Sequence, residues 1–217
     1  TATLQFDSAA HYAMMKADRY ENDIQAQIEA GSFLQAFACN YDLALKYYNR
    51  ALHIAEKNND SIDIAISYNY IGMVYYAKSN YDKALEYYNK ALTIQKAKLG
   101  EQHTDVARSY NNIGMLYQAN NDYDKALEYL NKALAIQKAK LGEQHTDVAR
   151  SYNNIGLVYQ ANNDYDKALE FFNKALAIQK AKLGEQHTDV ATSYNNIGLV
   201  YQANNDYDKA LEFFNKA

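Results

Sequence analysis

The sequence predicts an all-α fold, a solenoid of antiparallel helix pairs that repeats every 42 residues. Three observations lead to this prediction. Residues 104–145 recur as residues 146–187 with four changes, and residues 188–217 begin a third copy. The chain has no proline and eight glycines, so little interrupts a helix. Apolar residues within each copy follow helical spacing, so each copy buries its apolar face against its neighbours.

The first half of each copy predicts an amphipathic helix. Its apolar positions are separated by three or four residues, as in Val106, Tyr110, Ile113, Gly114 and Tyr117. Gly114 costs roughly 1 kcal/mol relative to alanine in a helix interior, yet a glycine stands there in each copy. We therefore expect close helix packing at this glycine, with the small residues Ala126 and Ala133 lying opposite.

The second half of each copy predicts another helix after a short polar break. Asp122 is a favourable N-cap residue, and Asp124 adds a carboxylate to the first turn. Gly142 follows Leu141 and predicts a left-handed stop. The apolar positions of this helix are Tyr123, Ala126, Leu127, Leu130, Ala133, Leu134 and Leu141.

The same pattern extends in a looser form toward the N-terminus. In residues 23–38, Ser32 is expected to replace the recurring glycine, and eleven helices are expected in all. We predict degenerate N-terminal or capping helices over residues 1–39 and tandem repeats over residues 40–217. The predicted repeat boundaries are 40–61 for the second helix of a first pair, then 62–103, 104–145, 146–187 and the truncated 188–217.

Composition excludes several classes of function. The net charge is −4, so no overall basic field would attract nucleic acid or an anionic membrane. The single cysteine, Cys39, has no internal disulfide partner and favours a reducing compartment. No basic segment precedes an apolar run, and no apolar run approaches the ~18 residues of a membrane span. We expect a cytoplasmic protein.

The repeated positions resemble the tetratricopeptide repeat. That family's Trp-Leu-Gly-Tyr-Ala-Phe-Ala pattern is matched by Tyr110, Ile113, Gly114, Tyr117, Ala126, Leu130 and Ala133. Tyr110 replaces the tryptophan, and Lys138 stands where the family has a late proline. The stretch KLGEQHTDVARSYNNIGMLYQ is similar to the kinesin light chain type, with Thr104 in place of a proline. The resemblance implies a right-handed superhelical solenoid that acts as a protein–protein interaction scaffold.

A second face of the first helices is the candidate binding surface, because in the family it lines the concave groove that holds extended peptides. Asparagine side chains both donate and accept hydrogen bonds, and arginine offers a bidentate fork to a carboxylate. The hypothesis is therefore an extended, acidic peptide bound along this groove. The candidate residues are Arg108, Asn111, Asn112, Met115, Gln118, Arg150, Asn153, Asn154, Leu157, Gln160, Asn195, Asn196 and Leu199. The alternative is a solvated face that recent duplication has copied.

No catalytic, cofactor or metal site is predicted. Asn120, Asp122 and Asp124 have the spacing of a calcium loop, but Lys125 stands where that loop needs glycine. We expect a helix cap there. One histidine recurs in each loop (His103, His145 and His187), and successive repeats are too far apart to share a metal ion, so a loop-capping role is expected. The sequence predicts a non-enzymatic protein.

Two further functions remain open. The chain ends inside a repeat, so head-to-tail self-association could form open chains or swapped dimers. RNA binding is known for other helical hairpin repeats, but it requires a basic groove.

Overall fold

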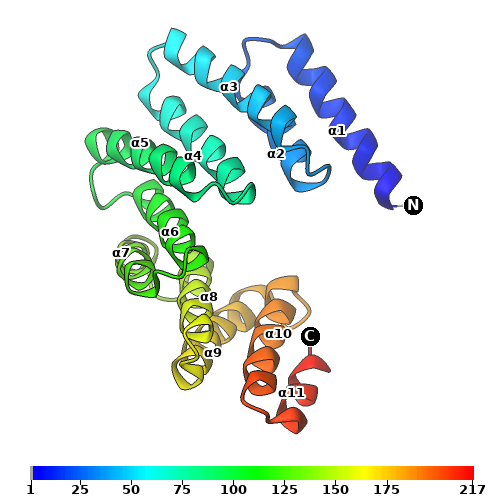
Figure 1. The fold of residues 1–217 in the computed structure, drawn as a ribbon, viewed down its shortest axis with the longest axis vertical. Coiled ribbons are helices and arrows are strands. Elements are labelled where there is room, and N and C mark those ends of the chain that lie inside the picture. Colours follow the sequence, from blue (N-terminus) through cyan, green and yellow to red (C-terminus); the bar gives the residue numbers. More distant parts are fainter. Residues whose placement is uncertain (1) are drawn as a thin grey trace. The chain divides into compact units, whose positions relative to one another are not determined.

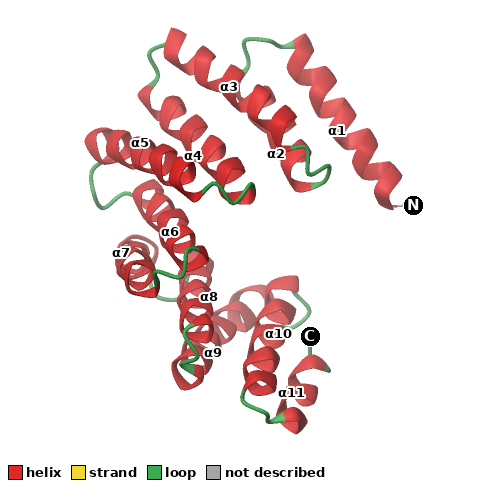
Figure 2. Cartoon of the chain, viewed as in Figure 1, coloured by secondary structure: helices red, strands yellow, loops and turns green. Residues whose placement is uncertain are grey.

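A computed structural model describes residues 2–217, with side-chain positions described for residues 9–217. This part of the chain holds eleven α-helices and no strand (Figures 1 and 2). The helices are α1 (Ala2–Arg19), α2 (Ile24–Ala36), α3 (Tyr41–Lys57), α4 (Ser61–Ala77), α5 (Tyr81–Leu99), α6 (Thr104–Ala119), α7 (Tyr123–Leu141), α8 (Thr146–Ala161), α9 (Tyr165–Leu183), α10 (Thr188–Ala203) and α11 (Tyr207–Phe214). The predicted all-α class and helix number are confirmed.

Consecutive helices pack as antiparallel pairs: α2 with α3, α4 with α5, α6 with α7, α8 with α9, and α10 with α11 (Figure 1). The chain divides into two compact units, Thr1–Glu101 and Gln102–Ala217. Within unit 1, α3 also packs on α4. Within unit 2, α7 packs on α8 and α9 on α10. Each unit is therefore a stack of helix pairs, as the sequence predicts. In the described residues, no helix is both long and apolar enough to cross a lipid bilayer.

The predicted helix caps are present. Asp122 Oδ1 accepts a hydrogen bond from the Lys125 N–H at 3.2 Å, which satisfies a donor that the helix start leaves unpaired. His145 Nδ1 accepts the Asp147 N–H at 3.1 Å, so this loop histidine caps a helix as expected. Gly142 ends α7 with φ +83° and ψ 155°. Its φ is positive as predicted, but its ψ places it in the extended region that only glycine visits readily, outside the left-handed helical region.

The recurring glycine marks a close helix contact, although the opposing residue differs from the one expected. A Cβ atom at Gly114 would lie 2.7 Å from Leu130 Cγ, and one at Gly156 would lie 2.6 Å from the ring of Phe172. Of the small residues expected opposite, Ala126 contributes its backbone oxygen near Gly114, at 3.2 Å from such a Cβ atom. The glycine thus leaves a hollow that a large side chain of the second helix fills.

The repeat register in α2 is shifted by one residue from the predicted one. A Cβ atom at Gly31 would lie 2.5 Å from the ring of Tyr48, so Gly31 is the recurring glycine and the assignment to Ser32 was wrong. The turn after α2 holds four residues (37–40), whereas the turn after α4 holds three (78–80). The turn absorbs the extra residue because helix packing at the glycine determines the register.

Candidate functional site

In unit 2, one row of asparagines lies on the first helices of the three pairs, α6, α8 and α10. The row consists of Asn112, Asn154 and Asn196, each half-buried. Within the described part of the chain, their side-chain amides make no hydrogen bond. Each amide therefore keeps free donors and an acceptor, held on a rigid helix and partly shielded from water.

The neighbouring row, one residue earlier, lies at the contact between successive helix pairs. The Ser151 hydroxyl donates to Gln137 Oε1 at 2.5 Å and also lies 3.2 Å from Asn111 Oδ1. Ser151 is fully buried, so this contact belongs to the packing of the α6–α7 pair on α8. Asn153 Oδ1, the equivalent atom in the next repeat, is buried without a hydrogen-bond partner. The two adjacent asparagine rows therefore have different surroundings: the Asn111 row lies at the contact between helix pairs, and the Asn112 row does not.

Apolar and amide side chains accompany the Asn112 row. Met115 and Leu157 are half-buried, while Leu199 is 39% exposed. Gln118 and Gln160, one helical turn further along the same face, are also half-buried. Asn195, the third member of the Asn111 row, is exposed. The face is thus amide-rich with an apolar side chain at each repeat.

The two predicted arginines are paired within their own helices. Arg108 Nη1 lies 2.9 Å from Asp105 Oδ1, and Arg150 Nη1 lies 3.0 Å from Asp147 Oδ1. Both arginine side chains are about 70% exposed, and such surface pairs contribute at most about 1 kcal/mol. In α10, Thr192 stands at the arginine position and Asp189 at the aspartate position.

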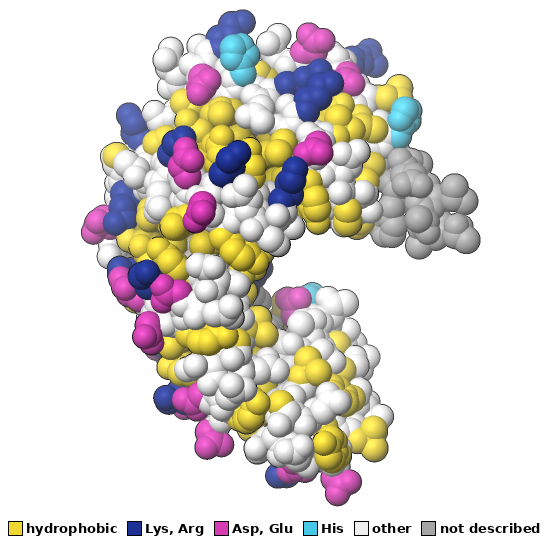
Figure 3. All heavy atoms as spheres, in the orientation of Figure 1, with side chains coloured by type: hydrophobic (Ala, Val, Ile, Leu, Met, Phe, Trp, Pro, Cys, Tyr) yellow, Lys and Arg dark blue, Asp and Glu magenta, His cyan; other side chains and the backbone are white. Residues whose placement is uncertain are grey.

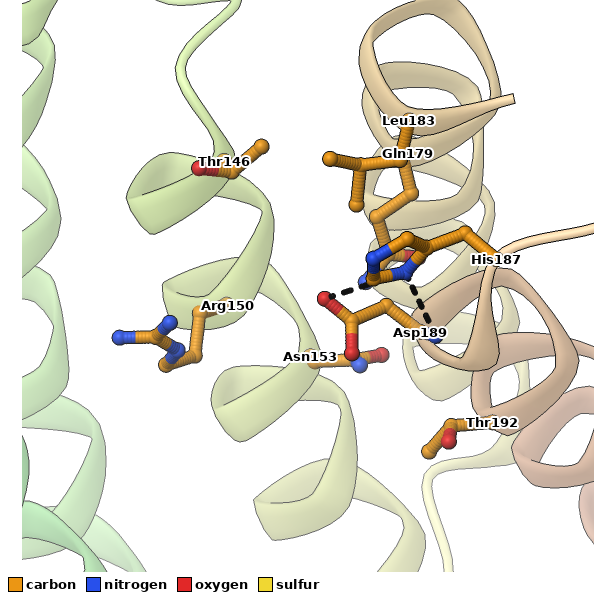
Figure 4. A pocket seen from close by; sticks show the side chains of 8 residues that line it. All are labelled: Thr146, Arg150, Asn153, Gln179, Leu183, His187, Asp189 and Thr192. Atoms are coloured by element: carbon orange, nitrogen blue, oxygen red, sulfur yellow. Dashed lines mark hydrogen bonds and ion pairs between the residues drawn. The ribbon is translucent and has the colours of Figure 1, made fainter.

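A hollow of about 300 Å³ lies where the pair α8–α9 meets α10 (Figure 4). Arg150 and Asn153 of α8 line it, as predicted site residues. The other lining residues include Gln179 of α9 and, at the start of α10, His187, Asp189 and Thr192. Gln179 and Asp189 were absent from the sequence prediction, and His187 was expected only to cap its loop. Thr192 lies on the predicted face, at the position that Arg150 occupies in the preceding copy.

The described residues contain no group of three or more histidine, cysteine, aspartate or glutamate side chains placed to hold a metal ion. On the face of the molecule shown in Figure 3, acidic and basic side chains lie next to one another. Such intermingling gives that face no extended basic patch of the kind that binds nucleic acid.

Stacked helix pairs with an amide-rich face on their first helices define a helical-repeat scaffold. The family model for the tetratricopeptide repeat matches residues 23–97, 63–139, 105–181 and 147–217. The chain therefore belongs to the tetratricopeptide repeat family. Proteins of this family are generally non-enzymatic, and membership supports a role as a protein–protein interaction scaffold.

Solved structures share the fold. BtubC from P. vanneervenii is 26% identical with a TM-score of 0.77, over 99% of this chain and 87% of that one. A Podosopora anserina protein with nearly identical TPR-like repeats, assigned as a kinesin light chain, is 23% identical with a TM-score of 0.72. That match covers 91% of this chain and 93% of the other. A Rap protein solved with the competence and sporulation factor is 22% identical with a TM-score of 0.76, over 89% and 52% of the two chains. No curated protein matches.

Proposed function

We propose that this protein binds an extended peptide segment of a partner protein along the face formed by α6, α8 and α10. The observation that carries this proposal is the row of half-buried amides at Asn112, Asn154 and Asn196, which have no partner within the described chain. A polar group that is partly shielded from water and already positioned loses little entropy on binding. The row therefore suits hydrogen bonding to a ligand.

The chemistry of the row favours peptide backbone as the ligand. An extended peptide presents N–H and C=O groups at regular intervals, and each asparagine offers both an acceptor and donors to them. Met115, Leu157 and Leu199 would contact apolar side chains of the peptide between these hydrogen bonds. Recognition would then depend on backbone conformation along the row and on side chains at a few positions.

Carboxylate groups of the peptide would bind at Arg108 and Arg150. Both guanidinium groups are well exposed, and their pairs with Asp105 and Asp147 are surface pairs of small net energy. A ligand carboxylate can therefore compete for the remaining donors of the fork. Support for a proteinaceous ligand also comes from the Rap protein of the same fold, which was solved in complex with the competence and sporulation factor.

The test starts from peptides selected on the wild-type chain from a random display library. Their affinity is measured by fluorescence anisotropy for wild type and for the triple variant Asn112→Ala/Asn154→Ala/Asn196→Ala. Each lost hydrogen bond is worth about 0.5–1.5 kcal/mol, so we expect a loss of at least about tenfold. The matched control is Asn131→Ala/Asn173→Ala, on exposed second-helix positions whose amides donate to their own helices.

Circular dichroism should show unchanged helicity and melting for both variants, because surface substitutions change stability by less than about 0.5 kcal/mol. Selected peptides that bind the triple variant as tightly as wild type would contradict the proposal. A preference for carboxylates is tested separately, by replacing aspartate and glutamate in the selected peptides with asparagine and glutamine.

Self-association is the second candidate, favoured by the surface of α11. Tyr207 and Leu211 are 63% and 61% exposed, whereas the equivalent Tyr165 and Leu169 pack against the core formed around Phe172. A second copy that covers this surface would give concentration-dependent sedimentation. Replacing both residues by lysine should then leave a monomer at all concentrations, and identical sedimentation of both proteins at all concentrations would contradict this candidate.

A further inference from the structure

A second hollow, of about 520 Å³, lies in unit 1 where the start of α2 meets the first turns of α4. Its apolar lining consists of Ile24, Ile28 and Ile66. Ile24 and Ile66 are half-buried, while Ile28 is 5% exposed. Two isoleucines on neighbouring helices therefore keep apolar surface in contact with water, and a ligand that covers this surface gains free energy.

The corresponding hollow of unit 2 has a polar lining. It is the one drawn in Figure 4, where Asn153 of α8 and Thr192 of α10 are among the lining residues. In the register of the recurring glycine, Ile28 stands at the position of Asn153 and Ile66 at the position of Thr192. The hollow of unit 1 is therefore apolar at two positions where its counterpart is polar, so the two hollows suit different ligands.

Two carboxylates, those of Asp23 and Asp63, line the hollow beside the isoleucines. In α6 and α8, the aspartate equivalent to Asp63 pairs with an arginine three residues later, but Ile66 stands at that position in α4. Asp63 is half-buried and forms no ion pair within the described residues. Burial and the nearby Asp60 carboxylate raise the pKa of Asp63. Asp23 uses one oxygen to accept the Ala26 N–H at 3.1 Å. The apolar hollow therefore carries negative charge that this part of the chain leaves uncompensated.

We propose that this hollow binds a lysine side chain of a partner protein. A lysine combines an aliphatic stem, which would cover Ile24 and Ile66, with a charged end that stays near water beside the carboxylates. Its ammonium has three donors and no fixed plane, so it suits carboxylates from two different helices better than the planar fork of an arginine does. The site lies in unit 1 and does not depend on the asparagine row of unit 2.

The test uses the peptide acetyl-Ala-Lys-Ala-amide as the probe and the full chain with ¹³C-labelled isoleucine methyl groups. Saturable shifts are expected for Ile24 and Ile66, and none for Ile136 and Ile178, which are buried in unit 2. Norleucine in place of the lysine keeps the stem without the charge, and diaminopropionic acid keeps the charge on a stem three methylenes shorter. Each replacement should weaken binding at least about fivefold.

Variants of the chain test the carboxylate. Asp63→Asn should weaken binding of the lysine probe at least about fivefold. Ile66→Arg should abolish it, because the new arginine would pair with Asp63 as Arg150 pairs with Asp147. The matched control is Asp147→Asn, at an aspartate that already has its arginine. It should leave binding unchanged. In wild type, saturation with the probe should lower the pKa of Asp63, followed by NMR of its carboxyl carbon, because an ammonium stabilises the charged form.

Equal binding of the norleucine and lysine peptides, or an Asp63→Asn variant that binds the lysine probe as wild type does, would overturn the inference. An arginine peptide that binds more tightly than the lysine peptide would also overturn it, since the hollow would then select a guanidinium. The triple asparagine variant of unit 2 should bind the lysine probe as wild type does. Failure of the lysine probe refutes this inference alone, and selected peptides insensitive to the triple variant refute the proposed function alone.

Discussion

Units 1 and 2 fill the hollow beside the recurring glycine with different side chains. In unit 1 the residue is a tyrosine, Tyr48 beside Gly31 and Tyr88 beside Gly72, whereas in unit 2 Leu130 and Phe172 occupy this position. The Tyr48 hydroxyl donates to Gln35 Oε1 at 3.2 Å and lies 3.2 Å from Ser32 Oγ. The same helix register therefore accepts a phenol or a hydrocarbon, since the packing requires volume at this position and the hydroxyl of Tyr48 has partners.

The buried serine between successive helix pairs is the same residue in both units, but its hydrogen-bond partner differs. In unit 2 the Ser151 hydroxyl donates to Gln137, but in unit 1 the Ser67 hydroxyl is buried without a partner. Ala55 stands at the position in α3 that Gln137 occupies in α7. The polar contact is therefore an addition to the stacking of helix pairs and not a condition for it.

The largest effect is expected from making unit 2 resemble unit 1. Gln137→Ala places alanine opposite Ser151, as Ala55 is placed near Ser67. The change leaves a buried hydroxyl unpaired and opens a cavity, so the free energy of unfolding should fall by about 3–4 kcal/mol. Urea denaturation followed by circular dichroism measures this loss. A loss below about 1 kcal/mol would show that the glutamine contributes little to the contact.

A pH series should destabilise unit 1 through its buried tyrosines. Burial raises the pKa of Tyr48 to about 12 and also raises the pKa of Tyr88. An unfolded tyrosine ionises near pH 10, so the stabilisation is complete below pH ~10 and is lost as the pH rises toward 12. Tyr48 alone should account for about 2–3 kcal/mol of that loss. The equivalent Leu130 and Phe172 in unit 2 do not ionise.

Urea midpoints measured between pH 9 and pH 11.5 for wild type and for Tyr48→Phe check this expectation. The phenylalanine variant should lose less stability over that range, because one buried ionisable group is gone. Parallel curves for the two proteins would show that ionisation of Tyr48 is not coupled to unfolding.

The smallest effect is expected for a matched pair of serine variants. Ser151→Ala removes a partner of a buried glutamine and should cost about 1–2 kcal/mol. Ser67→Ala removes a hydroxyl that has no partner, so its effect on stability should be near zero or slightly favourable. Thermal melting of the two variants under the same conditions gives the comparison. Equal losses would mean that Ser67 has a hydrogen-bond partner in solution.

Much of the local structure follows from the sequence because it depends on residues close together in the chain. The caps at Asp122 and His145 use backbone N–H groups two or three residues away. The helix stop at Gly142 depends on a conformation that residues with a Cβ atom avoid. The all-α class follows from a period that is visible in the letters alone.

The candidate site was less predictable, because identical residues in it have different hydrogen-bond partners on the neighbouring helix pair. Asn111 and Asn112 are identical and adjacent, yet Asn111 contacts Ser151 of the next pair and Asn112 does not. The spacing of Arg108 indicated a group free for a ligand, whereas Asp105 already pairs with it. The assignment to Ser32 in α2 was wrong by one residue because the turn after α2 contains an extra residue.

The sequence by itself determined that this chain forms stacked helix pairs, since periodicity, caps and glycine stops act over a few residues. Only the tertiary structure decided which asparagines remain unpaired and which side chain fills the hollow at each glycine. These features depend on side chains 14 to 40 positions apart that meet when helices pack within a pair or between successive pairs. Burial and hydrogen bonding at the contact between helix pairs determine which of two identical asparagines is paired and which is left unpaired.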